Sequence, residues 1–173
     1  MKIYLAHALT GAPEGFRQRM FALRQLFNSV SNVSVLAFNW IPGVGPDKTK
    51  NTYSYDMTQV HDACLMVGVL DHPSIGLGME IEKRCLLQRP MRLFYPAGSR
   101  VSQIVNDCIL MHRKCRLDPF TNRHFVRSEL DIVTSQTIIP DPIGYSSDAE
   151  IVGCVENLVL RNNISPVARQ MEY

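Results

Sequence analysis

Short apolar runs alternate along this chain with longer segments of helical periodicity. Runs with the length and composition of buried strands cover Lys2–Ala6, Val33–Phe38, Leu65–Leu70 and Met91–Tyr95. Apolar residues at steps of three and four predict helices over Pro13–Ser29, Thr52–Ala63, a segment that ends at Gln88, Arg100–His112 and Asp148–Arg161. This alternation predicts a three-layer α/β sandwich, with a mainly parallel five-stranded sheet and helices on both faces.

The C-terminal third has a less regular pattern. His124–Val133 alternates well enough to predict the fifth, edge strand, and the prolines and glycine of Thr134–Ser147 predict a long connection. We expect the last dozen residues to form a loose tail and Ile104 to point inward from its helix. At 173 residues, the chain is predicted to form one domain over residues 1–173.

Composition narrows the function classes. A formal net charge of +2 gives no electrostatic case for a nucleic-acid polymer or an anionic membrane as partner. The first residues run directly into a strand without a signal peptide, and no apolar span is long enough to cross a bilayer. The five cysteines lack paired metal-ligand spacing, which predicts reduced thiols in a cytoplasmic protein, with Cys64 and Cys85 packed as small apolar side chains. We expect no metal and no cofactor.

The stretch from Cys64 to Pro90 carries the strongest functional pattern, a buried strand, a glycine-containing loop and a helix. In α/β sheets, ligands bind at the carboxyl ends of strands. Gly76 and Gly78 would let backbone amides approach an anion or a sugar. We expect Glu80 in or near the first helical turn, where the helix dipole would keep its carboxylate ionised, as a nucleophile requires.

An ionised carboxylate beside such a loop suits attack on the anomeric carbon of a sugar. The transition state of that reaction resembles an oxocarbenium ion, so a nearby carboxylate stabilises it and can capture it covalently. A second carboxylate would then assist the leaving group, and Asp56 reaches this place only if its helix leans over the site. The spacing Gly-x-Gly-x-Glu alone is a weak signal, because it also occurs by chance.

Several segments together resemble the nucleoside 2-deoxyribosyltransferase superfamily, and within it the 2′-deoxynucleoside 5′-phosphate N-hydrolases and related nucleotide N-glycosidases. The segment Pro73–Glu80 is similar to the family's signature, and Ile3-Tyr4-Leu5 with the Gly11 loop is similar to its first strand. Asp56, 24 residues before Glu80, falls at the second catalytic acid, and Arg100-Val101-Ser102 is similar to the start of a phosphate-binding helix. The resemblance runs from Lys2 to about Asn106, and the chain diverges from about residue 115.

The resemblance implies a Rossmann-like or flavodoxin-like fold and a role for each matching residue. Glu80 would attack C1′ of the sugar and form a glycosyl-enzyme intermediate, Asp56 would assist departure of the base, and Tyr4 would hold Glu80. Ser74, Gly76 and Gly78 would bind the 5′ group, and Ser102 from a second chain would close the site of a homodimer or higher homo-oligomer. Release to water makes the protein a hydrolase, and release to another base makes it a transferase of nucleotide metabolism.

The chain also departs from the resemblance. Ala8 and Thr10 stand where the hydrolases carry a serine and an arginine that grip the phosphate. A phosphate would then depend on His7, Arg17 or Arg100. We expect His7 to be a hydrogen-bonding loop residue, and the arginines of the first helix, including Arg19, to lie on solvated faces.

Two further interpretations stay open. These are a non-catalytic nucleotide-binding sensor, and a neighbouring α/β group that acts on NAD or cytokinin-type nucleotides but usually has a doubled glycine before its glutamate. The sugar, the base and the acceptor are not fixed by the sequence.

Overall fold

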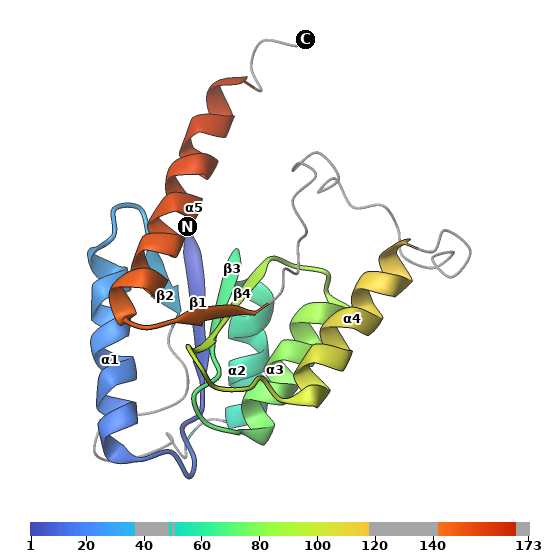
Figure 1. The fold of residues 1–173 in the computed structure, drawn as a ribbon. Helices are drawn as coiled ribbons and strands as arrows, with labels where there is room; N and C mark the ends of the chain where they lie inside the picture. Colours follow the sequence, from blue (N-terminus) through green and yellow to red (C-terminus); the bar gives the residue numbers. More distant parts are fainter. Residues whose placement is uncertain (37–48, 50, 118–141, 169–173) are drawn as a thin grey trace.

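The computed structural model of the chain describes residues 1–36, 49, 51–117 and 142–168. These residues form alternating strands and helices (Figure 1). In chain order the elements are β1 (Lys2–His7), α1 (Glu14–Ser29), β2 (Ser34–Leu36), α2 (Thr52–Asp62), β3 (Leu65–Val69), α3 (Ile75–Leu86), β4 (Met91–Pro96), α4 (Gln103–Leu117), β5 (Ile143–Tyr145) and α5 (Asp148–Ala168).

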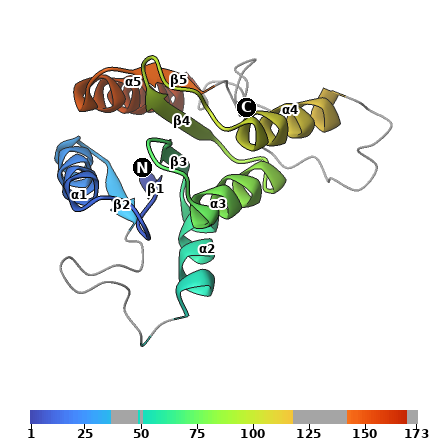
Figure 2. The ribbon, with the colours of Figure 1, turned by 60° about the horizontal axis from the view of Figure 1, so that its bottom comes forward.

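The strands form one five-stranded sheet in the order β2-β1-β3-β4-β5, and all four pairings are parallel. Helices α1 and α5 cover one face of this sheet, and α2, α3 and α4 cover the other (Figures 1 and 2). The side chains of successive β1 residues point to opposite faces of the sheet. Ile3 and Leu5 belong to the core beneath α1 and α5, whereas Tyr4 and Ala6 belong to the core beneath α3. The predicted three-layer α/β sandwich is confirmed.

The strand order fixes where a ligand site is expected. Strand β1 lies between β2 and β3, so the chain reverses its direction of travel across the sheet at this point. In doubly wound sheets of this flavodoxin-like order, ligands bind outside the carboxyl ends of the strands at that position. His7 pairs with Val69 at the carboxyl ends of β1 and β3. The loops after these two strands therefore meet at one edge of the sheet.

The structure corrects the predicted C-terminal elements. The fifth strand of the described sheet is β5, which lies inside the segment predicted as a long connection. The predicted strand His124–Val133 lies outside the described residues. Helix α5 continues through Ala168, so part of the expected loose tail is helical. On α4, Ile104 is 80% exposed and does not point inward.

Arg19 is not on a solvated face, contrary to expectation, because its guanidinium joins three elements. It pairs with Asp148 at the start of α5 and with Asp71 in the loop after β3, each at 2.6 Å, and it donates to the hydroxyl of Tyr145 on β5. The Tyr145 hydroxyl in turn donates to Asp71. This network ties α1 and α5 to the carboxyl edge of the sheet, and it holds the loop that leads into α3.

None of the helices in the described part of the chain has the length and apolar content that crossing a bilayer demands.

Candidate active site

A buried hydrogen bond joins the central strand to the helix that follows β3. The Tyr4 hydroxyl donates to Oε1 of Glu80 at 2.7 Å. The two side chains are 1% and 8% exposed, respectively. They meet because Tyr4 points to the α3 face of the sheet and Glu80 lies on the face of α3 that packs against it. The structure therefore brings together two residues that stand 76 positions apart in the sequence.

Helix α3 begins earlier than the sequence analysis predicted. Ser74 is its N-cap, and the Ser74 side chain accepts a hydrogen bond from the Leu77 amide at 3.3 Å. Glu80 is therefore in the second turn of α3, whereas the sequence analysis expected it in or near the first turn. Gly78 is helical, and its amide donates to the Ser74 carbonyl at 3.1 Å, so that amide is engaged within the helix.

Two groups at the start of α3 keep hydrogen-bonding capacity for a ligand. The Gly76 amide lies in the first turn, where backbone N–H groups have no intrahelical acceptor. The Ser74 hydroxyl accepts one hydrogen bond and retains its own hydrogen to donate. Of the three groups expected to hold a ligand here, Ser74 and Gly76 keep that capacity.

The environment of Glu80 favours its neutral form. The pKa of Glu80 is raised to about 8, chiefly by burial; the hydrogen bond from Tyr4 lowers it, and the negative charge of Asp56 adds to the increase. The expectation that the helix dipole keeps this carboxylate ionised is wrong in the ligand-free protein. The dipole acts within the first turn, and Glu80 lies beyond it, so desolvation determines the outcome.

Asp56 lies close enough to the Tyr4–Glu80 pair to act on both. It is half-buried in α2, which packs against α3. The charge of Asp56 adds to the effect of burial on the pKa of Glu80. The pKa of Tyr4 is raised by burial, by Glu80 and by Asp56. Tyr55, the neighbour of Asp56, also raises the pKa of Tyr4. Helix α2 thus brings Asp56 near the Tyr4–Glu80 pair, together with Tyr55, which the sequence analysis did not select.

Oε2 of Glu80 is buried and has no hydrogen-bond partner among the described residues. A buried acceptor without a partner costs free energy, and in native proteins such atoms concentrate at functional sites. Tyr4 holds Oε1, so the second oxygen is left for another molecule. The three acidic groups of Tyr4, Asp56 and Glu80 form a compact proton-bearing cluster suited to acid–base and nucleophilic chemistry.

The loop after β1 is held from within the chain. Gly11 has a φ of +77°, a conformation that favours glycine. Arg17, expected to be able to reach a phosphate, instead donates to the Ala12 carbonyl at 2.8 Å and pairs with Glu14. His7 ends β1 as a buried residue, so it is not a loop side chain. Its ring packs edge-on against Phe16, and burial lowers the pKa of His7 to about 4, which keeps it neutral.

Arg100 and Ser102 lie elsewhere on the same edge. Arg100 is exposed and lines a hollow of about 420 Å³ beyond the end of β4, together with Tyr95, Ser99 and Pro142. Ser102 is exposed at the start of α4, and its carbonyl accepts from the Asn106 amide. The lining of this hollow includes neither Tyr4 nor Glu80.

Nowhere in the described part of the chain do three or more histidine, cysteine, aspartate or glutamate side chains come together as metal ligands.

The chain is thus a parallel α/β protein with a buried cluster of acidic groups between its central strand and helix α3. No protein-family model matches the chain, and no curated protein matches it. Among solved structures it is similar to a 2-deoxyribosyltransferase from the psychrotolerant bacterium Bacillus psychrosaccharolyticus, with 20% identity, a TM-score of 0.47 and coverage of 62% of this chain and 82% of that one. It is also similar to a conserved protein from Enterococcus faecalis V583, with 18% identity, a TM-score of 0.47 and coverage of 90% and 97%. At this level of similarity neither structure identifies a function for this chain.

Proposed function

We propose that this chain is an enzyme of the nucleoside 2-deoxyribosyltransferase superfamily that cleaves or exchanges the N-glycosidic bond of a nucleoside or nucleotide. The observation that carries the proposal is the environment of Glu80. Its carboxyl group is buried, is held at Oε1 by Tyr4, and has Oε2 without a partner among the described residues. A nucleophile of the retaining glycosidase type needs this arrangement, because one oxygen must be fixed while the other is left to attack.

The reaction would run in two displacements. Oε2 of ionised Glu80 attacks C1′, the bond between C1′ and the base nitrogen breaks, and the base leaves with the bonding electrons. Asp56, in its protonated form, would give a proton to the departing base, and as a carboxylate it would take one from the incoming acceptor. Water as acceptor gives hydrolysis, and a second base gives transfer.

The pKa of Glu80, about 8, affects how this nucleophile is activated. Near neutral pH most of the ligand-free protein carries a neutral Glu80, and only the ionised fraction can attack. A sugar that develops positive charge at C1′ stabilises the carboxylate, so the favourable interaction is strongest in the transition state. We therefore expect kcat/KM to rise with pH as Glu80 ionises, with a midpoint near 8, because this parameter reports the free enzyme.

Arg17 bears on the choice between a nucleoside and its 5′-phosphate. Its guanidinium is engaged by Ala12 and Glu14, and the neighbouring positions Ala8 and Thr10 carry no charge. These contacts favour a nucleoside over a nucleoside monophosphate as substrate. The resemblance also implies a homodimer in which Ser102 of one copy, with Arg100 close to it in the sequence, completes the site of the other.

A base-release assay tests the proposal. The protein is incubated with ribo- and deoxyribonucleosides and with their 5′-monophosphates, and free base is separated and quantified. Release of base, faster from nucleosides than from monophosphates, is the expected result. Tight binding of a nucleotide without any release would contradict the enzyme and support the non-catalytic sensor. Addition of a second free base then separates exchange from hydrolysis.

A further inference from the structure

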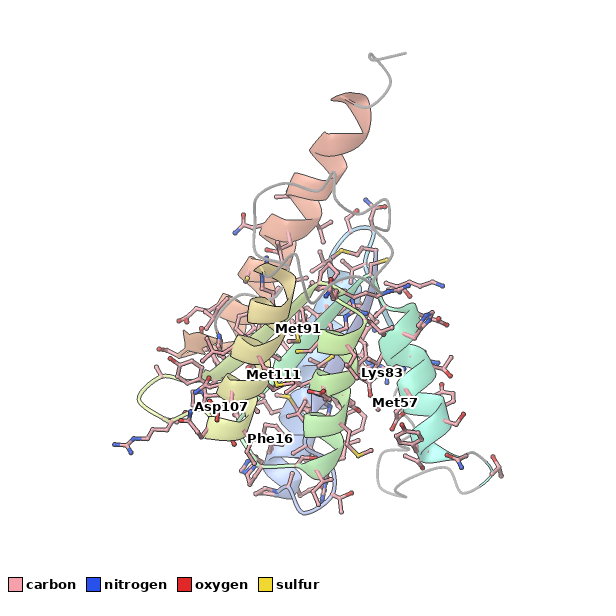
Figure 3. The ribbon with its side chains drawn as sticks, turned by 90° about the vertical axis from the view of Figure 1, so that its right-hand side faces the viewer. Phe16, Met57, Lys83, Met91, Asp107 and Met111 are labelled. Carbon is pink, nitrogen blue, oxygen red and sulfur yellow. The ribbon has the colours of Figure 1, made fainter. Side chains whose placement is uncertain are left out.

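Two cysteines that are 23 positions apart in the sequence face each other between α3 and α4. Sγ of Cys108 on α4 lies 3.8 Å from Sγ of Cys85 on α3. The two helices pack side by side on the same face of the sheet (Figure 3). The sequence analysis predicted that Cys64 and Cys85 pack as small apolar side chains; Cys85 is indeed fully buried, whereas Cys64, which precedes β3, is exposed. Core packing of Cys85 does not require a second thiol beside it, and Cys108 supplies one.

The two sulfur atoms are close to bonding distance. A disulfide bond is about 2.05 Å long, so they need to approach by less than about 2 Å. We expect side-chain rotation together with movement of α4 against α3 to cover that displacement. Neither Cys85 nor Cys108 is in a disulfide bond in this structure. The pair is therefore in the reduced state of a potential cross-link.

The two cysteines differ in access, which sets the order of reaction. Cys85 is fully buried, whereas Cys108 is only partly buried and is the one an oxidant can reach. Cys108 also donates to Oε2 of Glu82 at 2.8 Å, and Glu82 lies three residues before Cys85 on the same side of α3. Burial and the carboxylate of Glu82 raise the pKa of Cys108, so we expect the thiol to persist in the absence of an oxidant and to react slowly.

We propose that Cys85 and Cys108 form a reversible disulfide that locks α3 to α4 when the protein meets a peroxide. Cys108 attacks one peroxide oxygen and becomes a sulfenic acid as the O–O bond breaks and water leaves. Cys85 then attacks the Cys108 sulfur, the S–O bond breaks, and a second water leaves with the thiol proton. The peroxide is reduced by two electrons, the two thiols supply them, and a dithiol reductant reverses the bond.

The cross-link would act on the helix that carries the candidate nucleophile. Cys85 follows Glu80 by five residues on α3, and α4 begins directly after Ser102. A covalent bond between the helices restricts their relative motion in the folded protein. It also lowers the conformational entropy of the unfolded chain, which stabilises the folded state. We expect the oxidised protein to have a higher melting temperature. This inference concerns the thiols alone and is independent of the proposed function.

The test uses the folded chain of 173 residues with hydrogen peroxide and measures thiols, not activity. After oxidation, free thiols are alkylated, the chain is digested without reductant, and the linked peptides are identified by mass spectrometry. The expected result is a Cys85–Cys108 peptide pair, the loss of two alkylatable thiols and a rise in melting temperature, all reversed by dithiothreitol. A chain in which Cys64, Cys115 and Cys154 are replaced by serine should give the same result.

Matched variants keep the inference falsifiable. In Cys85→Ala, oxidation should stop at a sulfenic or sulfinic acid on Cys108 with no gain in melting temperature. In Cys154→Ser, which alters a partly buried cysteine outside the pair, the disulfide should form as in the wild type. The proposal would be overturned if Cys85 and Cys108 both remained alkylatable at peroxide doses that oxidise Cys64. Linkage of Cys108 to any cysteine other than Cys85 would also overturn it.

Discussion

At the scale of single residues, the protein places Glu80 under opposing influences. Burial favours the neutral carboxyl group and dominates, Asp56 acts in the same direction, and the hydrogen bond from Tyr4 favours the ionised form. The neighbours therefore control how much of Glu80 is available to attack. Because these influences have opposite signs, removing Tyr4 and removing Asp56 should have opposite effects on the same carboxyl group.

Replacing Tyr4 by phenylalanine and Asp56 by asparagine tests this balance. Tyr4→Phe removes the stabilising hydrogen bond, so the pKa of Glu80 should rise above its wild-type value of about 8. Asp56→Asn removes a like charge, so the pKa of Glu80 should fall. Carbon-13 NMR titration of glutamate-labelled protein measures both directly and requires no activity. Shifts of the same sign in the two variants would contradict this description of the site.

The same carboxyl group should make stability depend on pH. Its pKa in the folded protein is about 8, well above the ordinary value near 4.5 that it has when unfolded, so the folded state holds the proton more tightly between these limits. The free energy of unfolding should therefore decrease as pH rises from about 4.5 to 8, by on the order of a few kcal/mol. Urea denaturation at several pH values measures it.

Glu80→Gln serves as the control for that series, because glutamine keeps the shape of the side chain and does not titrate. The Glu80-dependent loss of stability should disappear in this variant. If the free energy of unfolding had the same pH dependence in the wild type and in Glu80→Gln, Glu80 would have an ordinary pKa in the folded protein, contrary to this account.

At the scale of elements, the start of α3 decides where Glu80 lies. Ser74 caps the helix, and its replacement by alanine should lower the free energy of unfolding by about 1 kcal/mol because the Leu77 amide loses its acceptor. Ser74→Thr keeps a hydroxyl at the cap and should retain most of that stability. Thermal or urea denaturation of both variants decides the matter, and equal losses in the two would argue against a capping role.

The elements also show how far the sequence alone reaches. Strands β1, β3 and β4 and helices α1 and α2 were predicted to within about two residues, because each is a long apolar run or a clear periodic segment. The start of α3 was placed too late, since Gly76 and Gly78 were interpreted as loop residues. Ser74 as N-cap was the signal that could have corrected this.

Strand β5 was beyond sequence reasoning for a different reason. Ile143–Tyr145 is three residues long, lies in a segment with prolines, and has no periodicity of its own. It is a strand because Phe94–Pro96 on β4 offer a free edge to pair with. Pairing of this kind is set by tertiary structure and leaves little trace in a short stretch of sequence.

The candidate site also has features that the sequence predicted and features that it did not. The resemblance of the sequence selected Tyr4, Asp56 and Glu80, and these three residues cluster in the structure. The engagement of Arg17 by Ala12 and Glu14 depends on contacts that no spacing shows. The raised pKa of Glu80 was also missed, since burial of a polar residue cannot be inferred from its position at a helix start.

At the scale of the whole molecule, the Arg19 network holds the two helices of one face to the edge of the sheet. Its partners Asp71 and Asp148 lie 52 and 129 positions away in the sequence. Removing the guanidinium leaves two carboxylates near each other without their cation. The consequence should be felt in the stability of the entire domain and not in a single loop.

Arg19→Met should therefore lower the free energy of unfolding by about 2–3 kcal/mol. Arg19→Lys should lose less, because lysine keeps the charge but cannot reproduce the forked hydrogen bonds to Asp148. Urea denaturation followed by circular dichroism measures both. An Arg19→Met protein as stable as the wild type would show that the network contributes little.

The most direct test of the central claim is the rate of base release by Glu80→Gln compared with the wild type on the best nucleoside substrate. The variant should fold normally, because glutamine can still accept the hydrogen bond from Tyr4. Its rate should fall by about 10³-fold or more, since the attacking oxygen is lost. A folded Glu80→Gln protein that releases base at the wild-type rate would contradict the assignment of Glu80 as the nucleophile.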